Sequence, residues 1–223
     1  KLYKGETLGL IGESGSGKTS LSNAILKIHK FEEGEIYFNG HDISKIQGKE
    51  LLGFRKNIQI VFQDPYASLN PLHNIYQIIS EPLIFHKICR KEDLYDECKR
   101  LINDVGLSEN FLDSYPHELS GGQRQRVCIA RAISVKPQVL ICDESVSALD
   151  VSIQATVLNL LNKLKQKYNF TYIFISHDLS VVRHMSDKIL VLHNGKIVEY
   201  NDADLLFKKP KDTYTKKLIK ASL

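Results

Sequence analysis

The sequence has no tryptophan, a single methionine and only four cysteines. The cysteines form no Cys-x-x-Cys pair and no zinc-like spacing with histidine, so neither a zinc site nor a disulfide scaffold is indicated, and we expect reduced thiols. Long apolar runs are missing too, since none approaches the roughly 20 residues that span a bilayer. We therefore expect any role at a membrane to depend on partner proteins.

What is present is typical of a globular protein. The chain has 223 residues, 43% of them hydrophobic and 25% charged, which suits one core or a core that carries a smaller subdomain. The net charge is +4, and lysines are densest over residues 208–220. No aromatic residues are interleaved in a recognition motif there, so this stretch indicates a solvated tail, and we expect no nucleic-acid partner.

Short apolar runs rich in branched residues alternate with helical patterns. The runs predict strands at residues 7–11, 58–62, 139–142, 171–175 and 189–192. Helical spacing follows over 20–28 and 153–164, whereas 72–132 is helical in pattern without strand runs. Strands apolar on both faces predict a parallel sheet covered by helices. Two Asn-Gly pairs, Asn39-Gly40 and Asn194-Gly195, predict tight turns at antiparallel edges.

A glycine-rich turn joins the first strand to the first helix. It matches the phosphate-binding pattern G-x-x-x-x-G-K-[ST], with Ser20 following, over Gly12, Glu13, Ser14, Gly15, Ser16, Gly17, Lys18 and Thr19. Backbone N–H groups of such a loop and the positive end of the helix dipole bind phosphate. We expect Lys18 to reach the β- and γ-phosphates and the Thr19 hydroxyl to coordinate magnesium. The alternative is a glycine-rich turn with an accidental Lys-Thr pair.

The apolar strand at 139–142 ends in two acids, Asp143 and Glu144. A buried strand would deliver Asp143 to the sheet edge where ligands bind, so that it can hold magnesium through water. Glu144 is then suited to polarise the attacking water as a general base. Alone, an acidic pair after a strand often marks only a helix N-terminus. Together with the phosphate loop, the pair favours a nucleotide site.

A second glycine-rich helix start has the sequence Leu119-Ser120-Gly121-Gly122-Gln123. A nucleotide kinase or a GTPase has no use for such an element. The Ser120 hydroxyl and the glycine amides would form a second anion-binding helix terminus. An N-capped helix without a ligand would account for Ser120 but not for the paired glycines.

These motifs together resemble the ABC ATPase family, whose signature reads LSGGQ, over essentially the whole chain. The resemblance implies an α/β, P-loop NTPase (RecA-like) core with a mostly parallel sheet, an antiparallel β edge and an inserted helical subdomain. It places the core at 1–71 and 133–200, the helical subdomain at 72–132 and a C-terminal tail at 201–223. The family's adenine-stacking aromatic residue lies upstream of Lys1, so we expect the chain to be N-terminally truncated, and Tyr3 lies too close to the first strand to replace that residue.

The resemblance also assigns roles to residues between the motifs. Gln63 matches the glutamine that touches magnesium and the attacking water, Asp150 ends the loop that crosses the dimer seam, and His177 matches the switch histidine at the γ-phosphate. ATP and Mg²⁺ are the implied cofactors. The implied catalytic residues are Glu144, His177 and Gln63, and the implied metal ligands are Thr19, Gln63 and Asp143. Ser145 departs from the proline or alanine more common in the family, without a change of charge.

In this family two subunits close head to tail around two ATP molecules, with the signature of one facing the phosphate loop of the other. The stretches 62–71, 81–83 and 146–155 resemble the F-type ATPase subunit of oligopeptide and dipeptide importers, which implies a D-type companion. The resemblance also implies two transmembrane permease subunits and, indirectly, an extracytoplasmic solute-binding protein. The location that follows is peripheral, at the cytoplasmic face of the inner (cell) membrane.

Other functions share part of this pattern. Nickel, glutathione and other solute importers remain open as alternatives. A soluble ABC ATPase of DNA repair would separate its motifs by long coiled coils, and one of translation would carry two cassettes. This sequence has no sustained heptads and one cassette. A nucleotide-binding module without turnover is disfavoured because Glu144 and His177 are both present.

Overall fold

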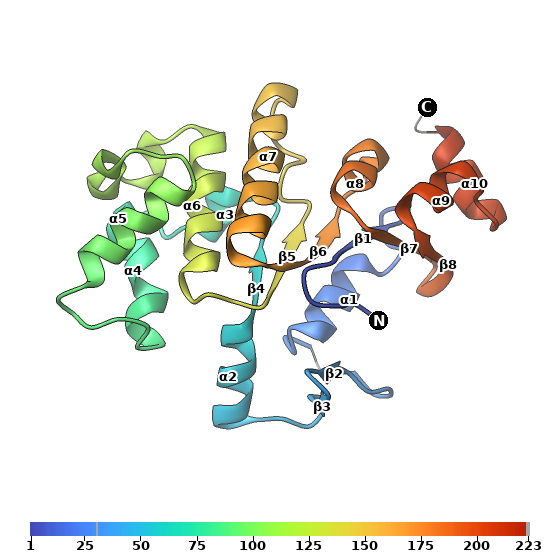
Figure 1. Ribbon diagram of the computed structural model, residues 1–223, viewed down its shortest axis with the longest axis horizontal. Coiled ribbons are helices and arrows are strands. Elements are labelled where there is room, and N and C mark those ends of the chain that lie inside the picture. Colours follow the sequence, from blue (N-terminus) through green and yellow to red (C-terminus); the bar gives the residue numbers. More distant parts are fainter. Residues whose placement is uncertain (30, 222–223) are drawn as a thin grey trace.

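A six-stranded sheet with the order β4-β5-β6-β1-β7-β8 forms the centre of the computed structural model, which describes residues 1–29 and 31–221 (Figure 1). Residue 30, in the predicted core, and residues 222–223, in the predicted tail, lie outside the described residues. The strands are β1 (Thr7–Ile11), β4 (Ile58–Val61), β5 (Val139–Asp143), β6 (Thr171–Ile175), β7 (Lys188–His193) and β8 (Lys196–Asp202). All neighbours pair in parallel except β7 and β8, which confirms the expected sheet and its antiparallel edge.

Both Asn-Gly pairs form the predicted tight turns. Asn39-Gly40 joins β2 (Tyr37–Phe38) to β3 (His41–Asp42), which pair as a small separate antiparallel sheet. Asn194-Gly195 joins β7 to β8. Asn39 and Asn194 have φ angles of 51° and 48°, the left-handed conformation that two-residue hairpin turns require and that asparagine tolerates.

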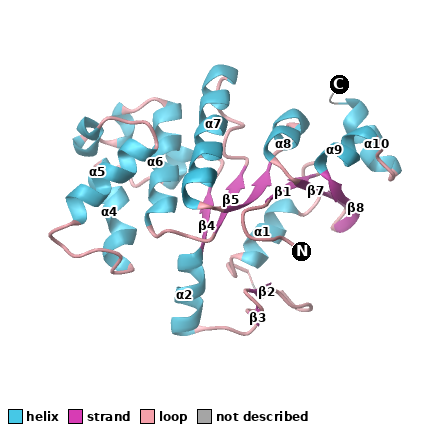
Figure 2. Ribbon diagram, in the orientation of Figure 1, coloured by secondary structure: helices cyan, strands magenta, loops and turns pink. Residues whose placement is uncertain are grey.

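Helices cover both faces of the large sheet. α7 (Val151–Tyr168) and α8 (Leu179–Met185) lie on one face and α1 (Lys18–Ile25) on the other (Figures 1 and 2). α2 (Gly48–Asn57) leads into β4. The predicted helix at 20–28 therefore starts two residues late, because the glycine loop passes directly into α1. It also ends too late, because Lys27 leaves the helical conformation at a φ of 53°.

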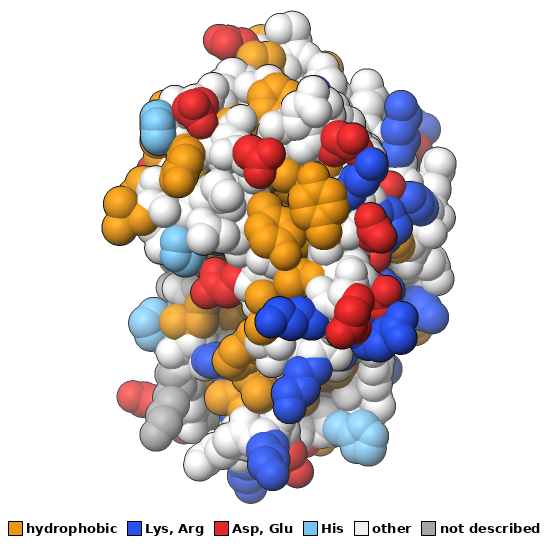
Figure 3. Space-filling model, turned by 90° about the vertical axis from the view of Figure 1, so that its left-hand side faces the viewer, with side chains coloured by type: hydrophobic (Ala, Val, Ile, Leu, Met, Phe, Trp, Pro, Cys, Tyr) orange, Lys and Arg blue, Asp and Glu red, His pale blue; other side chains and the backbone are white. Residues whose placement is uncertain are grey.

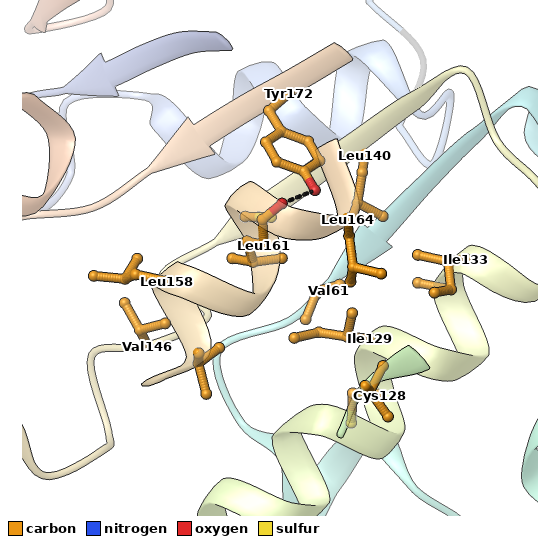
Figure 4. Close-up of a cluster of buried hydrophobic side chains, with 14 of the residues drawn as sticks. Val61, Cys128, Ile129, Ile133, Leu140, Val146, Leu158, Leu161, Leu164 and Tyr172 are labelled. Carbon is orange, nitrogen blue, oxygen red and sulfur yellow. Dashed lines mark hydrogen bonds between the residues drawn. The ribbon is translucent and has the colours of Figure 1, made fainter. Parts of the chain in front are cut away.

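Alternate residues of the central strands supply two separate cores. On β6, Tyr172 and Phe174 join the cluster that contains α7 and α6, whereas Ile173 and Ile175 join the cluster on the α1 face. This alternation follows from the two-residue period of a strand that is buried on both sides. Figure 4 shows the larger cluster, where the Tyr172 hydroxyl donates a hydrogen bond to the Leu161 carbonyl at 2.8 Å.

A helical segment lies between β4 and β5, as the sequence predicted. It contains α3 (Pro65–Ser68), α4 (Ile75–Phe85), α5 (Leu94–Asp104), the 3-10 turns η1 (Glu109–Asp113) and η2 (Pro116–Glu118), and α6 (Gly121–Ser134). α6 runs past residue 132, and the division of the chain at 72 and 132 stays a prediction. Figure 3 views this end of the molecule, where apolar side chains lie among charged ones.

The segment predicted as a tail is folded where the structure describes it. β8 continues to Asp202, and α9 (Ala203–Lys208) and α10 (Thr213–Ala221) pack beside it at the edge of the sheet (Figure 1).

All four cysteines are unpaired, and burial raises the pKa of Cys98 and of Cys142 to about 12. No helix within the described residues is both long enough and apolar enough to span a membrane.

Candidate nucleotide-binding site

Four parallel strands deliver the predicted site residues to one edge of the sheet. The phosphate loop follows β1, Gln63 follows β4, Asp143 ends β5, and His177 follows β6. The register aligns these ends, because Asp143 lies opposite Ile175 on the neighbouring strand. Carboxyl ends of parallel strands form the ligand-binding edge of open α/β sheets. The pairing therefore gathers residues that lie far apart in the sequence.

Close backbone approach shapes the start of the phosphate loop. A Cβ atom on Gly12 would lie 2.3 Å from the carbonyl oxygen of Leu192 and 2.6 Å from Oγ of Ser16, so no side chain fits there. Further along the loop, the Ser16 N–H donates to the Glu13 carbonyl at 3.1 Å. The loop consequently turns tightly between the end of β1 and the start of α1.

Lys18 closes the loop from within. Its side chain is buried, and Nζ donates hydrogen bonds to the carbonyls of Gly12 at 2.7 Å and Glu13 at 2.9 Å. An ammonium group has three N–H donors, and these two contacts use two of them. The third remains available to an anion that enters the loop.

One polar cavity connects the phosphate loop to residues from two other strands. Its volume is about 420 Å³, and it is lined by Ser14, Gly15, Gly17, Lys18, Thr19, Ser20, Gln63 and Glu144. The structure thus brings six of the nine predicted phosphate-loop residues, 12–20, together with Gln63 and Glu144. Gly12, Glu13 and Ser16 shape the loop from outside this lining.

Glu144 and His177 face each other across the ends of β5 and β6. Oε2 of Glu144 lies 3.4 Å from Nδ1 of His177. The Glu144 backbone has a φ of 47°, and its N–H donates to the Ile175 carbonyl at 2.9 Å. Ser147 Oγ donates to the Glu144 carbonyl at 2.8 Å. Glu144, which lines the cavity, thus lies next to an imidazole, an arrangement suited to proton transfer from water.

The signature residues lie elsewhere. Ser120 caps α6 in a reciprocal pair with Gln123, whose side-chain oxygen accepts from the Ser120 N–H at 2.8 Å. Ser120, Gly122 and Gln123 line a separate cavity of about 290 Å³, whereas Gly121 and Asp150 line neither cavity. The chain therefore does not bring its own signature into its own phosphate-loop cavity.

Comparison with known proteins identifies the family. The sequence profile described as ABC transporter matches residues 1–147. The chain belongs to the ABC transporter family. Membership makes it an ABC-type ATPase. The fold agrees, since the solved dimer of the ATP-binding cassette MJ0796, bound to ADP and Pi, superposes with a TM-score of 0.81 and 30% identity over 91% of this chain and 88% of that one.

Relatives within the family carry transport names. The chain is 51% identical to the "Oligopeptide transport ATP-binding protein OppF" of Streptococcus mutans, over 99% of this chain and 72% of that protein. It is 45% identical to the "Glutathione import ATP-binding protein GsiA" of Pectobacterium atrosepticum, over 99% of this chain and 35% of that protein. Both likenesses extend along nearly the whole cassette.

Burial of Asp143 in this ABC cassette destabilises the charged form of its carboxyl group. Desolvation and the neighbouring Glu144 raise the pKa of Asp143, and Lys18 lowers it in part. The charged carboxylate is thus destabilised, so a cation bound beside it would be favourable. No cluster of three or more His, Cys, Asp or Glu side chains suited to a metal occurs among the described residues. Magnesium does not need one, because it uses one or two carboxylates together with water and substrate phosphates.

Two contacts to the phosphate loop have no signal in the sequence. The Gly195 N–H of the β7–β8 turn donates to the Ser16 carbonyl at 3.0 Å. The Glu13 N–H donates to the Tyr214 hydroxyl of α10, also at 3.0 Å. No local pattern signals either contact, because each joins residues that are distant in the sequence.

Close packing of α6 against α7 leads to a test of the paired glycines. A Cβ on Gly122 would lie 2.5 Å from Cγ2 of Ile153, whereas a Cβ on Gly121 would come no closer than 3.8 Å, to Leu149. We expect Gly122→Ala to lower the free energy of unfolding by about 1–3 kcal/mol through overpacking. Gly121→Ala, the matched control, should change it by less than about 0.5 kcal/mol. Chemical denaturation measures both.

A double variant separates this clash from other effects of the substitution. Gly122→Ala combined with Ile153→Ala should be less destabilised than the sum of the two single changes, because the second removes the clashing atoms. Equal stability losses for Gly121→Ala and Gly122→Ala would contradict the packing argument.

Proposed function

We propose that the chain binds and hydrolyses ATP to drive the import of oligopeptides or dipeptides through partner membrane subunits. The observation that carries the proposal is the single cavity that Lys18, Gln63 and Glu144 line together, with His177 against Glu144. The name of the Streptococcus mutans relative supports peptides as the solute class.

The phosphate loop suits a triphosphate. In the proposed site, N–H groups of the loop over residues 12–20 surround the β- and γ-phosphates at the N-terminus of α1. Lys18 contributes its remaining N–H donor while its two carbonyl contacts keep the ammonium in place. The exposed hydroxyls of Thr19 and Ser20 lie on the same cavity.

Magnesium fits the oxygen donors at this edge. We assign Thr19 and Gln63 as direct ligands and Asp143 as a ligand through water. The raised pKa of Asp143 supports this assignment, since a neighbouring cation would stabilise its charged form. A bound magnesium ion supplies charge neutralisation of the phosphates.

Hydrolysis in the proposed mechanism depends on positioning. Glu144 orients and deprotonates the attacking water, and Gln63, which lines the same cavity, helps to hold that water. His177 lies within reach of Glu144 and would contact the γ-phosphate as charge develops. Fixed donors that face developing charge account for most of the rate in such sites.

The separation of the two motifs supports a site shared between subunits. Ser120, Gly121, Gly122 and Gln123 lie outside the chain's own phosphate-loop cavity. We propose that they cap the ATP held by the phosphate loop of a D-type companion, with Asp150 at the seam, in a head-to-tail dimer. The solved MJ0796 cassette is a dimer, which supports pairing of this general kind.

The proposed location is peripheral, at the cytoplasmic face of the inner membrane, on two permease subunits that receive solute from an extracytoplasmic binding protein. Exposed apolar side chains on the helical segment support a docking surface there. Leu72, Ile84 and Phe85 are 82%, 60% and 63% exposed. In an interface with a partner these side chains would be removed from water, which is favourable.

Glu144 and Lys18 provide the test of hydrolysis. Glu144→Gln removes the base and keeps the loop, so we expect turnover to fall by about 100-fold or more while ATP still binds. Lys18→Ala should instead weaken ATP binding itself. Phosphate release and calorimetry measure the two effects. Turnover of Glu144→Gln within a few-fold of the parent would remove Glu144 from the role of base, and unchanged ATP affinity in Lys18→Ala would contradict the loop assignment.

Gly121 provides the test of head-to-tail pairing. A Cβ on Gly121 would make only an ordinary contact, with Leu149 at 3.8 Å, so Gly121→Asp places a charged obstruction in the signature with little effect on the chain's own packing. In a pair with the companion subunit, photo-crosslinking of azido-ATP should persist on the substituted chain and be lost on the companion. Gly121→Ala is the control. Loss of label from the substituted chain, with label on the companion retained, would show that the signature acts within one chain.

Proteoliposomes provide the test of the solute. We expect vesicles with both permeases, both ATP-binding subunits and the binding protein to accumulate a labelled oligopeptide when ATP is supplied. The same complex with Glu144→Gln should not. If the vesicles accumulated labelled glutathione and no peptide, the transported solute would instead be glutathione, as in the name of the Pectobacterium relative.

A further inference from the structure

Helix α10 touches the phosphate loop directly. Tyr214, on the first turn of α10, accepts a hydrogen bond from the Glu13 N–H at 3.0 Å. Its ring stacks on His193 at the end of β7, with 3.8 Å between ring centroids and an interplanar angle of 24°. Stacking and hydrogen bonding together give the tyrosine a defined orientation against the loop.

Glu13 connects this contact to the lysine of the loop. Its carbonyl accepts hydrogen bonds from the Ser16 N–H and from Lys18 Nζ, at 3.1 and 2.9 Å. The N–H of Glu13 donates a hydrogen bond to the Tyr214 hydroxyl. A rotation of the backbone at Glu13 would therefore change the Tyr214 contact and move an acceptor of the Lys18 ammonium.

α10 is itself anchored at its start. The buried carboxylate of Glu199, on β8, accepts hydrogen bonds from the backbone N–H groups of Lys211 and Asp212 at 3.0 Å each. Asp212 then caps α10 by accepting from the Tyr214 N–H at 2.7 Å. Charge-assisted hydrogen bonds of this kind are stronger than neutral ones. The position of Tyr214 is thus set by the sheet rather than by a free tail.

We propose that Tyr214 is a positioning residue for ATP binding: α10 clamps the phosphate loop through the Tyr214 hydroxyl and so keeps Lys18 in its binding position. The inference rests on the proposed function, because it concerns the same nucleotide site. It assigns a role in that site to the stretch 201–221, which the sequence suggested only as a tail.

Tyr214→Phe isolates the hydroxyl, since phenylalanine keeps the ring that stacks on His193. We expect the Kd and the KM for Mg-ATP to rise about 3- to 10-fold, from the loss of one hydrogen bond, with kcat within about 2-fold of the parent. Tyr214→Ala should raise both constants further. Tyr200→Phe is the matched control, because its hydroxyl, also at this edge, bonds to the Lys1 carbonyl instead and should leave both constants unchanged.

Amide hydrogen exchange gives a second readout that needs no nucleotide. The Glu13 amide should exchange several-fold faster in Tyr214→Phe, while the melting temperature of the nucleotide-free protein stays the same. Unchanged ATP affinity and unchanged Glu13 exchange in Tyr214→Phe would overturn the clamp and leave the proposed function intact. Failure of the parent chain to bind ATP would overturn the proposed function and the clamp with it.

Discussion

Parallel pairing of β1 inside the sheet is the constraint on which the rest of the structure depends. β1 lies between β6 and β7, and Leu10 is opposite Ile175 on one side and Leu190 on the other. Leu10 belongs to one core and Ile11 to the other, so a shift of one residue would exchange the two faces. Hydrophobic burial therefore fixes the register, and the register fixes where the phosphate loop begins.

The phosphate loop is held on several sides before any ligand arrives. The close approach of Gly12 to the Leu192 carbonyl fixes its start, and the Gly195 N–H fixes the Ser16 peptide. Tyr214 fixes Glu13 from the opposite end of the sequence. A loop that is already ordered loses less conformational freedom when it binds phosphate. The β7–β8 edge and α10 thus serve the site although they contain none of its motifs.

The phosphate loop, with Glu144, and the signature at the start of α6 lie on separate cavities. Burial raises the pKa of Asp143, and Lys18 lowers it only in part. A bound cation would therefore stabilise the charged carboxylate. Ser120, by contrast, caps α6 on another cavity. The chain therefore holds the acidic residues and the glycine-rich loop at one place and the capped start of α6 at another. Complementary halves on one chain suit an assembly in which two cassettes face each other.

The sequence by itself determined the family, the strand-loop-helix unit around Lys18 and the residues that line the phosphate-loop cavity. These features are local or follow from hydrophobic periodicity, since a phosphate loop is a contiguous pattern and a doubly buried strand is a contiguous apolar run. Both Asn-Gly turns were predictable for the same reason. The limits of α1 were not, because they depend on the conformation of the loop before it and of Lys27 after it.

Only the tertiary structure decided which of these residues meet. The 3.4 Å approach of Glu144 to His177 depends on the pairing of β5 with β6, and the common cavity of Gln63 and Lys18 depends on strands that are not adjacent in the sheet. The contact between Glu13 and Tyr214 spans 201 residues and has no sequence signal. A hydrogen bond between such distant groups is set by the packing of the whole chain, so no local pattern of residues could contain it.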